Sequence, residues 1–117
     1  MMQIMMPRGD MVSKSFVIWD PDKALFTNQF DEIYFTVKKT YRDRNYLFQK
    51  RLSNGGIVNV GEGKYQFTIM PEDTNNLDFG EYMFDIELVI EGQMKKTFTG
   101  RLRLTEESTH ATNEVIS

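Results

Sequence analysis

The sequence has no cysteine, a single histidine and only three prolines in 117 residues. Without cysteine it can form neither a disulfide framework nor a thiolate metal site, which suits folding in a reducing compartment. No stretch approaches the roughly 18 consecutive apolar residues that a membrane-spanning helix needs. The apolar segment 1–6 lacks the basic start and long apolar run of a secretory signal. We therefore expect no membrane span and no export through a signal peptide.

Groups that could carry out catalysis are equally scarce. The one histidine, His110, belongs to a polar C-terminal stretch where no rigid catalytic geometry is expected. With no cysteine, and no base placed beside a serine or threonine, nucleophilic catalysis has no evident pair. Glycine-rich phosphate loops and the HExxH zinc motif are missing too. The sequence predicts a protein that is not an enzyme and that has no catalytic residue, cofactor or metal.

Two short patterns leave alternatives open. Asp20 and Asp22, together with the pair Asp31-Glu32, could gather around Ca²⁺, although the EF-hand spacing is missing and turn formation explains them more simply. Arg8-Gly9-Asp10 spells an integrin-type adhesion tripeptide, but a glycine at this place also lets the chain turn after a proline.

The net charge of −3 argues against a general attraction to nucleic acid.

Signals for β-strands dominate what is present. Hydrophobic residues make up 40% of the chain, with nine Phe, five Tyr and one Trp, which is ample for one core. Residues 33–37 are β-branched and aromatic, and 64–70 and 80–90 alternate apolar with polar. The last strand places Phe98, Leu102 and Leu104 on one face. Weaker strands over 11–19, 45–52 and 57–60 bring the total to about seven.

The register between the strands before and after Glu91-Gly92 can be predicted, because the core-facing residues of the two strands must lie opposite each other. A two-residue loop would set Ile86 opposite Thr97, beside solvent-facing residues. A three-residue loop that includes Gln93, or a bulge nearby with the same effect, sets Ile86 opposite Phe98. The same shift sets Tyr82 opposite Leu102. We expect one of these two arrangements.

A distinctive corner runs from Pro71 to Tyr82. Pro71 ends a strand, Leu77 offers an apolar plug, and Gly80 opens the next strand two residues before Tyr82. This arrangement is similar to the corner of immunoglobulin-like domains, where a tyrosine hydroxyl bonds to nearby backbone. We therefore predict an all-β, immunoglobulin-like antiparallel β-sandwich of about seven strands over residues 11–105. Residues 1–10 form an N-terminal arm or edge strand, and 106–117 a polar, flexible tail.

Charge is sorted along the chain, and two tyrosines interleave with the basic run. Residues 38–51 hold six basic side chains and one acid, whereas 72–91 hold seven acids and no basic residue. Three explanations compete: pairing of Lys50 or Arg51 with Asp85 or Glu87 across one sheet, nucleic-acid binding, and docking to a partner or a second copy. The candidate docking surface comprises Lys38, Lys39, Tyr41, Arg42, Arg44, Tyr46, Lys50, Arg51, Glu72, Asp73, Glu81, Asp85 and Glu87.

Several segments together resemble a known group of proteins. They are Met6–Asp10, Leu25–Asn28, Phe30–Lys38, Leu47–Leu52, Pro71–Thr74 and Phe79–Ile86. Over residues 6–107 the chain is similar to small β-sandwich proteins from phage and prophage tail regions of Gram-positive bacteria, and to the N-terminal domain of phage baseplate upper proteins. The longer members continue into a helical stalk and distal domain, which leaves host attachment by this chain in doubt.

The resemblance implies a virion structural role. The chain would be an adaptor of the phage tail that docks onto other tail or baseplate proteins, or onto a second copy of itself, after synthesis in the bacterial cytoplasm. The main alternative is a carbohydrate-binding module, because exposed aromatics flanked by polar groups can hold a glycan. Trp19, Tyr34, Tyr41 and Tyr46 are its candidate residues, although Trp19 more simply closes one end of the core.

Overall fold

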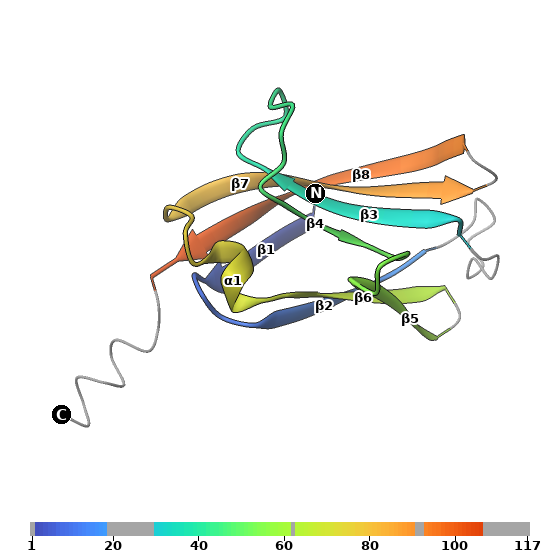
Figure 1. Cartoon of the computed structure of the whole chain (residues 1–117), viewed down its shortest axis with the longest axis horizontal. Coiled ribbons are helices and arrows are strands. Elements are labelled where there is room, and N and C mark those ends of the chain that lie inside the picture. Colours follow the sequence, from blue (N-terminus) through green and yellow to red (C-terminus); the bar gives the residue numbers. More distant parts are fainter. Residues whose placement is uncertain (1, 19–29, 62, 91–92, 107–117) are drawn as a thin grey trace.

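Two β-sheets packed face to face make up the fold (Figure 1). The computed structural model describes residues 2–18, 30–61, 63–90 and 93–106, without the side chains of 93–96. Five strands form the larger sheet, in the order β1 (Met2–Pro7), β8 (Gln93–Thr105), β7 (Gly80–Ile90), β3 (Glu32–Lys38) and β4 (Phe48–Arg51). Three form the smaller one, in the order β2 (Val12–Val17), β6 (Lys64–Ile69) and β5 (Ile57–Gly61). A single helical turn, α1 (Pro71–Thr74), follows β6. The prediction of an all-β sandwich is confirmed.

The core lies between the sheets and follows the predicted alternation. Ile33, Phe35 and Val37 of β3 are all completely buried. The ring of Phe35 stacks on Phe67 of the opposite sheet with 4.0 Å between centroids, and Phe84 lies 5.1 Å away. Aromatic pairs with such spacing add to the free energy gained from burying their area. This cluster joins the two layers at their centre.

Two details of the predicted sandwich need correction. The described residues contain eight strands, not about seven, because the N-terminal segment forms β1. The sheets are not wholly antiparallel, since β1 runs parallel to β8. The reason is that β1 turns at Gly9 (φ 83°) into β2 of the other sheet and contributes buried Ile4 and Met6 to the core. Of the predicted tail 106–117, all but Glu106 lies outside the described residues.

The predicted register of β7 and β8 is confirmed. Ile86 pairs with Phe98 and Tyr82 with Leu102, and an irregularity between Leu88 and Val89 supplies the expected bulge. Phe98 nevertheless keeps 40% of its surface exposed. Because β1 pairs only with residues 100–105 of β8, no described strand flanks Phe98 on that side.

The corner between α1 and β7 is held by side chains that reach back to the main chain. The Tyr82 hydroxyl donates a hydrogen bond to the carbonyl oxygen of Asp78 at 2.7 Å, the type of contact expected from the sequence. Buried Thr74 accepts a hydrogen bond from the amide of Gly9 at 2.8 Å. The Arg8 guanidinium donates to the carbonyl of Leu77 at 3.2 Å. Arg8 and Gly9 of the adhesion-like tripeptide therefore bind the corner.

Replacing Tyr82 by phenylalanine is expected to lower the free energy of unfolding by about 1 kcal/mol, since one partly buried hydrogen bond is lost. Burial, with a contribution from the charge of Asp78, raises the pKa of Tyr82. The unfolded chain therefore loses this proton first, so the stability from Tyr82 is complete below pH of about 10 and is lost as pH rises through the folded pKa. Urea unfolding of both proteins across alkaline pH tests this. An unchanged alkaline decline in the variant would contradict it.

Candidate docking surface

The feature that stands out from the sandwich is the loop between β3 and β4, residues 39–47 (Figure 1). It leaves the body of the protein between Val37 and Phe48, which are paired across the two strands. Its far end is shaped by Asp43, whose carboxylate accepts a hydrogen bond from the amide of Thr40 at 3.1 Å, while the amide of Asp43 donates to the carbonyl of Thr40. Such local bonds of aspartate to the backbone stabilise tight turns. The loop therefore has a defined turn.

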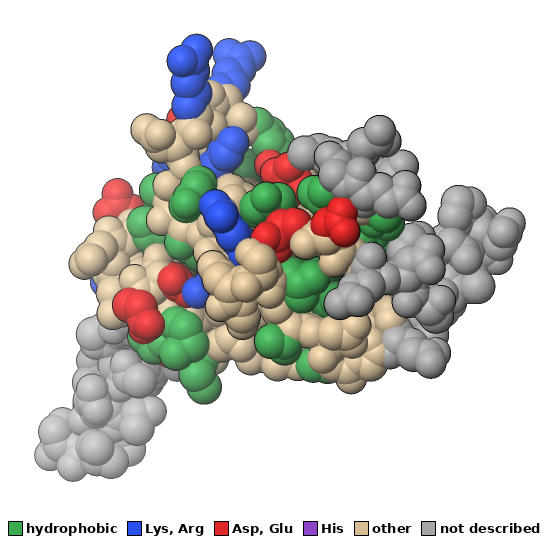
Figure 2. Space-filling model, turned by 45° about the vertical axis from the view of Figure 1, so that its right-hand side comes forward, with side chains coloured by type: hydrophobic (Ala, Val, Ile, Leu, Met, Phe, Trp, Pro, Cys, Tyr) green, Lys and Arg blue, Asp and Glu red, His purple; other side chains and the backbone are tan. Residues whose placement is uncertain are grey.

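Large side chains of this loop face solvent. Tyr41, Tyr46 and Leu47 keep 50%, 49% and 42% of their surface exposed. Arg42 and Arg44 are exposed as well. Figure 2 shows basic side chains at the end of this projection. At the base, the ammonium of Lys39 lies 4.5 Å from the ring centroid of Tyr82. Five of the predicted docking residues (Lys39, Tyr41, Arg42, Arg44 and Tyr46) thus share one projecting surface, which we call the basic loop.

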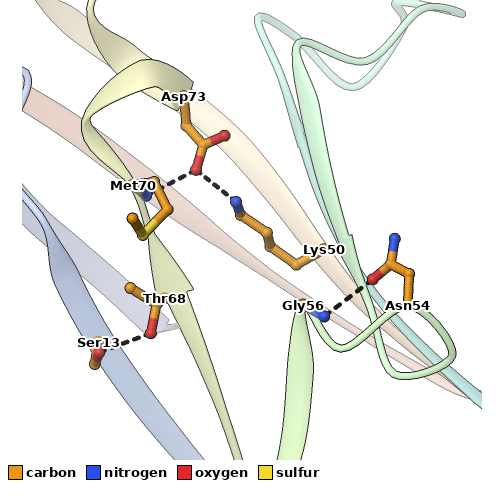
Figure 3. Close-up of polar contacts among 7 residues, drawn as sticks. All are labelled: Ser13, Lys50, Asn54, Gly56, Thr68, Met70 and Asp73. Carbon is orange, nitrogen blue, oxygen red and sulfur yellow. Dashed lines mark hydrogen bonds and ion pairs between the residues drawn. The ribbon is translucent and has the colours of Figure 1, made fainter.

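The remaining basic candidates lie elsewhere. Lys38 and Arg51 belong to the outer face of the larger sheet, where the Arg51 guanidinium lies 5.4 Å from the ring centroid of Tyr34. Lys50 lies on the opposite face of β4, the same as buried Phe48, and forms an ion pair of 2.6 Å with Asp73 of α1 (Figure 3). The same carboxylate oxygen accepts a hydrogen bond from the amide of Met70 at 2.8 Å. In the sequence, Lys50 belongs to the basic run 38–51 and Asp73 to the acidic run 72–91, and both are part of the candidate docking surface predicted from it. In the fold these two side chains contact each other instead.

The predicted pairing of Lys50 or Arg51 with Asp85 or Glu87 is therefore wrong. It assumed that the strand carrying Lys50 lies beside β7, but β3 takes that place. The physical reason is that the wholly apolar inward face of β3 belongs at the centre of the sheet, whereas short and basic β4 suits an edge.

The Lys50–Asp73 pair gives a testable prediction. Only 15% and 14% of the two side chains are exposed, so the pair is screened less than a surface pair. We expect Lys50→Met to lower the free energy of unfolding by about 1–3 kcal/mol, because it leaves a shielded carboxylate without its cation. A double-mutant cycle with Asp73→Asn, measured by urea unfolding, is expected to give a coupling energy of about 1 kcal/mol. Additive effects of the two substitutions would contradict the account. The exposed pair Glu81–Arg101, at 3.9 Å, is the matched control and is expected to show little coupling.

The acidic candidates do not form one patch. Glu72 is exposed on α1, whereas Glu81, Asp85 and Glu87 lie along the outer face of β7. There Asp85 is opposite Thr36, and Glu87 is opposite Tyr34. Burial raises the pKa of Asp85, and the positive charge of nearby Lys38 opposes that rise. Charges that are separated along the sequence therefore mix on the outer face of the larger sheet.

The residues singled out from the sequence that lie outside the described part of the chain are Trp19, Asp20, Asp22, His110 and the loop pair Glu91-Gly92. One surface feature was missed. Phe79 is 46% exposed, lies 4.2 Å from the guanidinium of Arg8 and lines a hollow of about 370 Å³ with Arg103, Thr105 and Glu106. An aromatic residue just outside the alternation of β7, between Asp78 and Gly80, was the available signal.

Among the described residues, no group of three or more His, Cys, Asp or Glu side chains could hold a metal ion, and no helix is long and apolar enough to cross a membrane.

Comparison with known proteins identifies a similar fold and no family. Neither protein-family models nor curated proteins match this sequence. A solved structure that does match is the endo-β-1,4-mannanase from Thermotoga petrophila, with a TM-score of 0.57 and 17% sequence identity. The similarity covers 90% of this chain and 18% of the mannanase chain, so this chain spans less than a fifth of that enzyme. At this identity the likeness shows a shared fold alone.

Proposed function

We propose that this chain is a non-catalytic docking protein that binds other proteins through its basic loop. The observation that carries the proposal is the combination of two half-exposed tyrosines with exposed Arg42 and Arg44 on one projection. Tyrosine and arginine are the residue types over-represented among the residues that dominate binding energy. Positive charge on the same projection would speed encounter with an acidic partner.

The proposed fold is an immunoglobulin-like variant of the sandwich. Its support is the strand order: β2-β6-β5 corresponds to the B-E-D strands of such domains and β8-β7-β3 to their G-F-C strands. The bond from Tyr82 to the carbonyl of Asp78 adds the corresponding corner. Domains of this architecture serve many unrelated functions, so the topology supports a scaffold for binding without specifying the partner.

The proposed setting is the tail of a phage or prophage, with other tail or baseplate proteins as partners. Its support is the sequence resemblance over residues 6–107. In that setting the basic loop would fasten the sandwich to a neighbouring subunit with complementary acidic charge.

Binding measurements with loop variants test the docking function. The purified chain is titrated against purified tail and baseplate proteins. Replacing Tyr41 and Tyr46 together by alanine is expected to weaken binding by about 30-fold or more. Replacing Arg42 and Arg44 by alanine is expected to slow association and reduce its dependence on salt. Asn45→Ala, an exposed position in the same loop, is the matched control and should bind like the wild type. Equal binding by all variants would refute the loop as the docking site.

A second candidate function, carbohydrate binding, has support of its own. The comparison with the mannanase favours it over a tail role, since that protein acts on a polysaccharide and this fold covers only a minor part of it. Half-exposed Tyr41 and Tyr46 and the hollow beside Phe79 are aromatic surfaces flanked by polar groups. Tyr34 is a weaker candidate, because the guanidinium of Arg51 lies over its ring.

The two functions predict different behaviour of the same variants. A neutral glycan such as mannan would bind with little dependence on salt, and binding would fall with Phe79→Ala or the double tyrosine variant but not with the double arginine variant. An acidic protein partner would respond to both double variants. Retention on immobilised mannan and on cell-wall glycans distinguishes them, and a wild-type chain that elutes unretained from both would dismiss the second candidate.

A further inference from the structure

The four outer strands of the two sheets are β1, β4, β2 and β5, and three of them carry features that discourage pairing with another chain. β4 has only four residues, two of them basic. In the middle of β2, Lys14 is paired with buried Phe67 and so lies on the face of the sheet that is turned towards the core, yet its side chain is exposed at the edge. β5 has an irregular register between Asn59 and Gly61. Short length, charge and bulges are the means by which proteins protect sheet edges.

β1 has none of these three features, and its one proline, Pro7, is its last residue. Its six residues, Met2–Pro7, contain no charge, and its only described neighbour in the sheet is β8. Met2 and Met5 keep 41% and 64% of their surface exposed. An uncharged, exposed edge of this length is a template for pairing with another strand.

The backbone of β1 determines which groups are available. The amide of Arg8 donates a hydrogen bond to the carbonyl of Thr105 in β8. Because the direction of the backbone groups alternates along a strand, the amides and carbonyls of Met6, Ile4 and Met2 also face β8. By the same alternation, the amides and carbonyls of Gln3 and Met5 face the open edge. Pro7 has the same orientation but no N–H to donate.

We infer that β1 pairs antiparallel with β1 of a second copy, which joins two five-stranded sheets around a two-fold axis. With Ile4 opposite Ile4 of the other copy, Gln3 faces Met5 and Met5 faces Gln3, so every available amide and carbonyl of these two residues is used. Shifting the strands by two residues would place Pro7 opposite Gln3 and lose a donor. The occupant is a second copy because this register matches the strand to itself, with no like charges opposed, as a two-fold interface requires.

The interface is small and belongs to the transient class, so association is expected only at high concentration. Analytical ultracentrifugation of the full chain over a concentration series is expected to show a monomer–dimer equilibrium that salt changes little, unlike docking through the basic loop. Met5→Pro removes one outward donor from each copy, and an edge strand tolerates proline where the amide faces solvent. It is expected to weaken the dimer about 10- to 100-fold. A second variant, Met5→Lys, places a charge on the exposed edge strand and is also expected to weaken the dimer. Its control is Met11→Lys, because Met11 is similarly exposed, at 65%, but lies outside β1, and this variant is expected to dimerise like the wild type.

Amide hydrogen exchange of the wild-type chain tests the register without a variant. The amides of Gln3 and Met5 are expected to become protected as concentration rises, whereas those of Ile4 and Met6 are protected throughout by β8. A chain that stays monomeric at millimolar concentration overturns the inference. So does a dimer in which Gln3 and Met5 exchange at concentration-independent rates. Neither result bears on the proposed docking function.

Discussion

Gly100→Ala is expected to destabilise the protein by about 2–4 kcal/mol, because β8 has no room for a side chain at this position. A Cβ there would lie 2.3 Å from Cζ of Phe84 and 2.5 Å from the carbonyl oxygen of Met2. The first contact could be relieved by moving a ring, but that ring is buried in the core. The second is with the backbone of β1, so relief would disturb the pairing of β1 with β8.

Gly61→Ala is the matched control for this prediction. Gly61 also lies in a strand, and a Cβ there would meet only the Cβ of Lys64 at 3.9 Å, an ordinary contact. Urea unfolding is expected to show a small effect at Gly61 and a large one at Gly100. Similar midpoints for the two alanine variants would show that β1 and Phe84 do not pack closely against Gly100.

Phe35→Ala is expected to cost about 3–5 kcal/mol, a large share of the stability of a domain of this size. Its ring is completely buried and contacts aromatic rings from both sheets: Phe48, Phe67 and Phe84. Truncation would remove these contacts and leave a cavity at the centre of the interface between the layers.

Tyr41→Ala is the control for the loss of an aromatic side chain. Half of Tyr41 is exposed, so its replacement is expected to change the free energy of unfolding by no more than about 0.5 kcal/mol. The same measurement on the variant with both Tyr41→Ala and Tyr46→Ala establishes that the protein used in the binding experiments is folded. Comparable losses for Phe35→Ala and Tyr41→Ala would contradict the placement of the core.

The sequence was sufficient to predict the sandwich and much of its local detail. Alternation in 64–70 and 80–90 correctly indicated which side chains of β6 and β7 are buried, since a half-buried strand must alternate. Matching inward faces also gave the register of β7 and β8 with its bulge, because a shift by one residue would have turned Ile86 away from Phe98.

Contacts between distant segments could not be predicted in this way. Nothing in the local pattern of Met2–Pro7 says that it runs parallel to β8, because that direction follows from the turn at Gly9 and from the place of β2 in the other sheet. The pair Lys50–Asp73 was missed for a similar reason: it depends on where α1 meets the edge of β4. Of the candidate docking residues, the five in the basic loop share one projecting surface, whereas the others are divided among α1, β3, β7 and the two faces of β4.

Incorporation into tail particles is the most direct test of docking through the basic loop. For the proposed tail setting, the chain and its variants are expressed while phage tails assemble, and the purified tails are analysed by quantitative mass spectrometry. The wild type and Asn45→Ala are expected in the tails at equal amounts, and the variant with Tyr41→Ala and Tyr46→Ala is expected to be largely absent although folded. Equal incorporation of all three, or absence of the wild-type chain from the tails, would contradict the account.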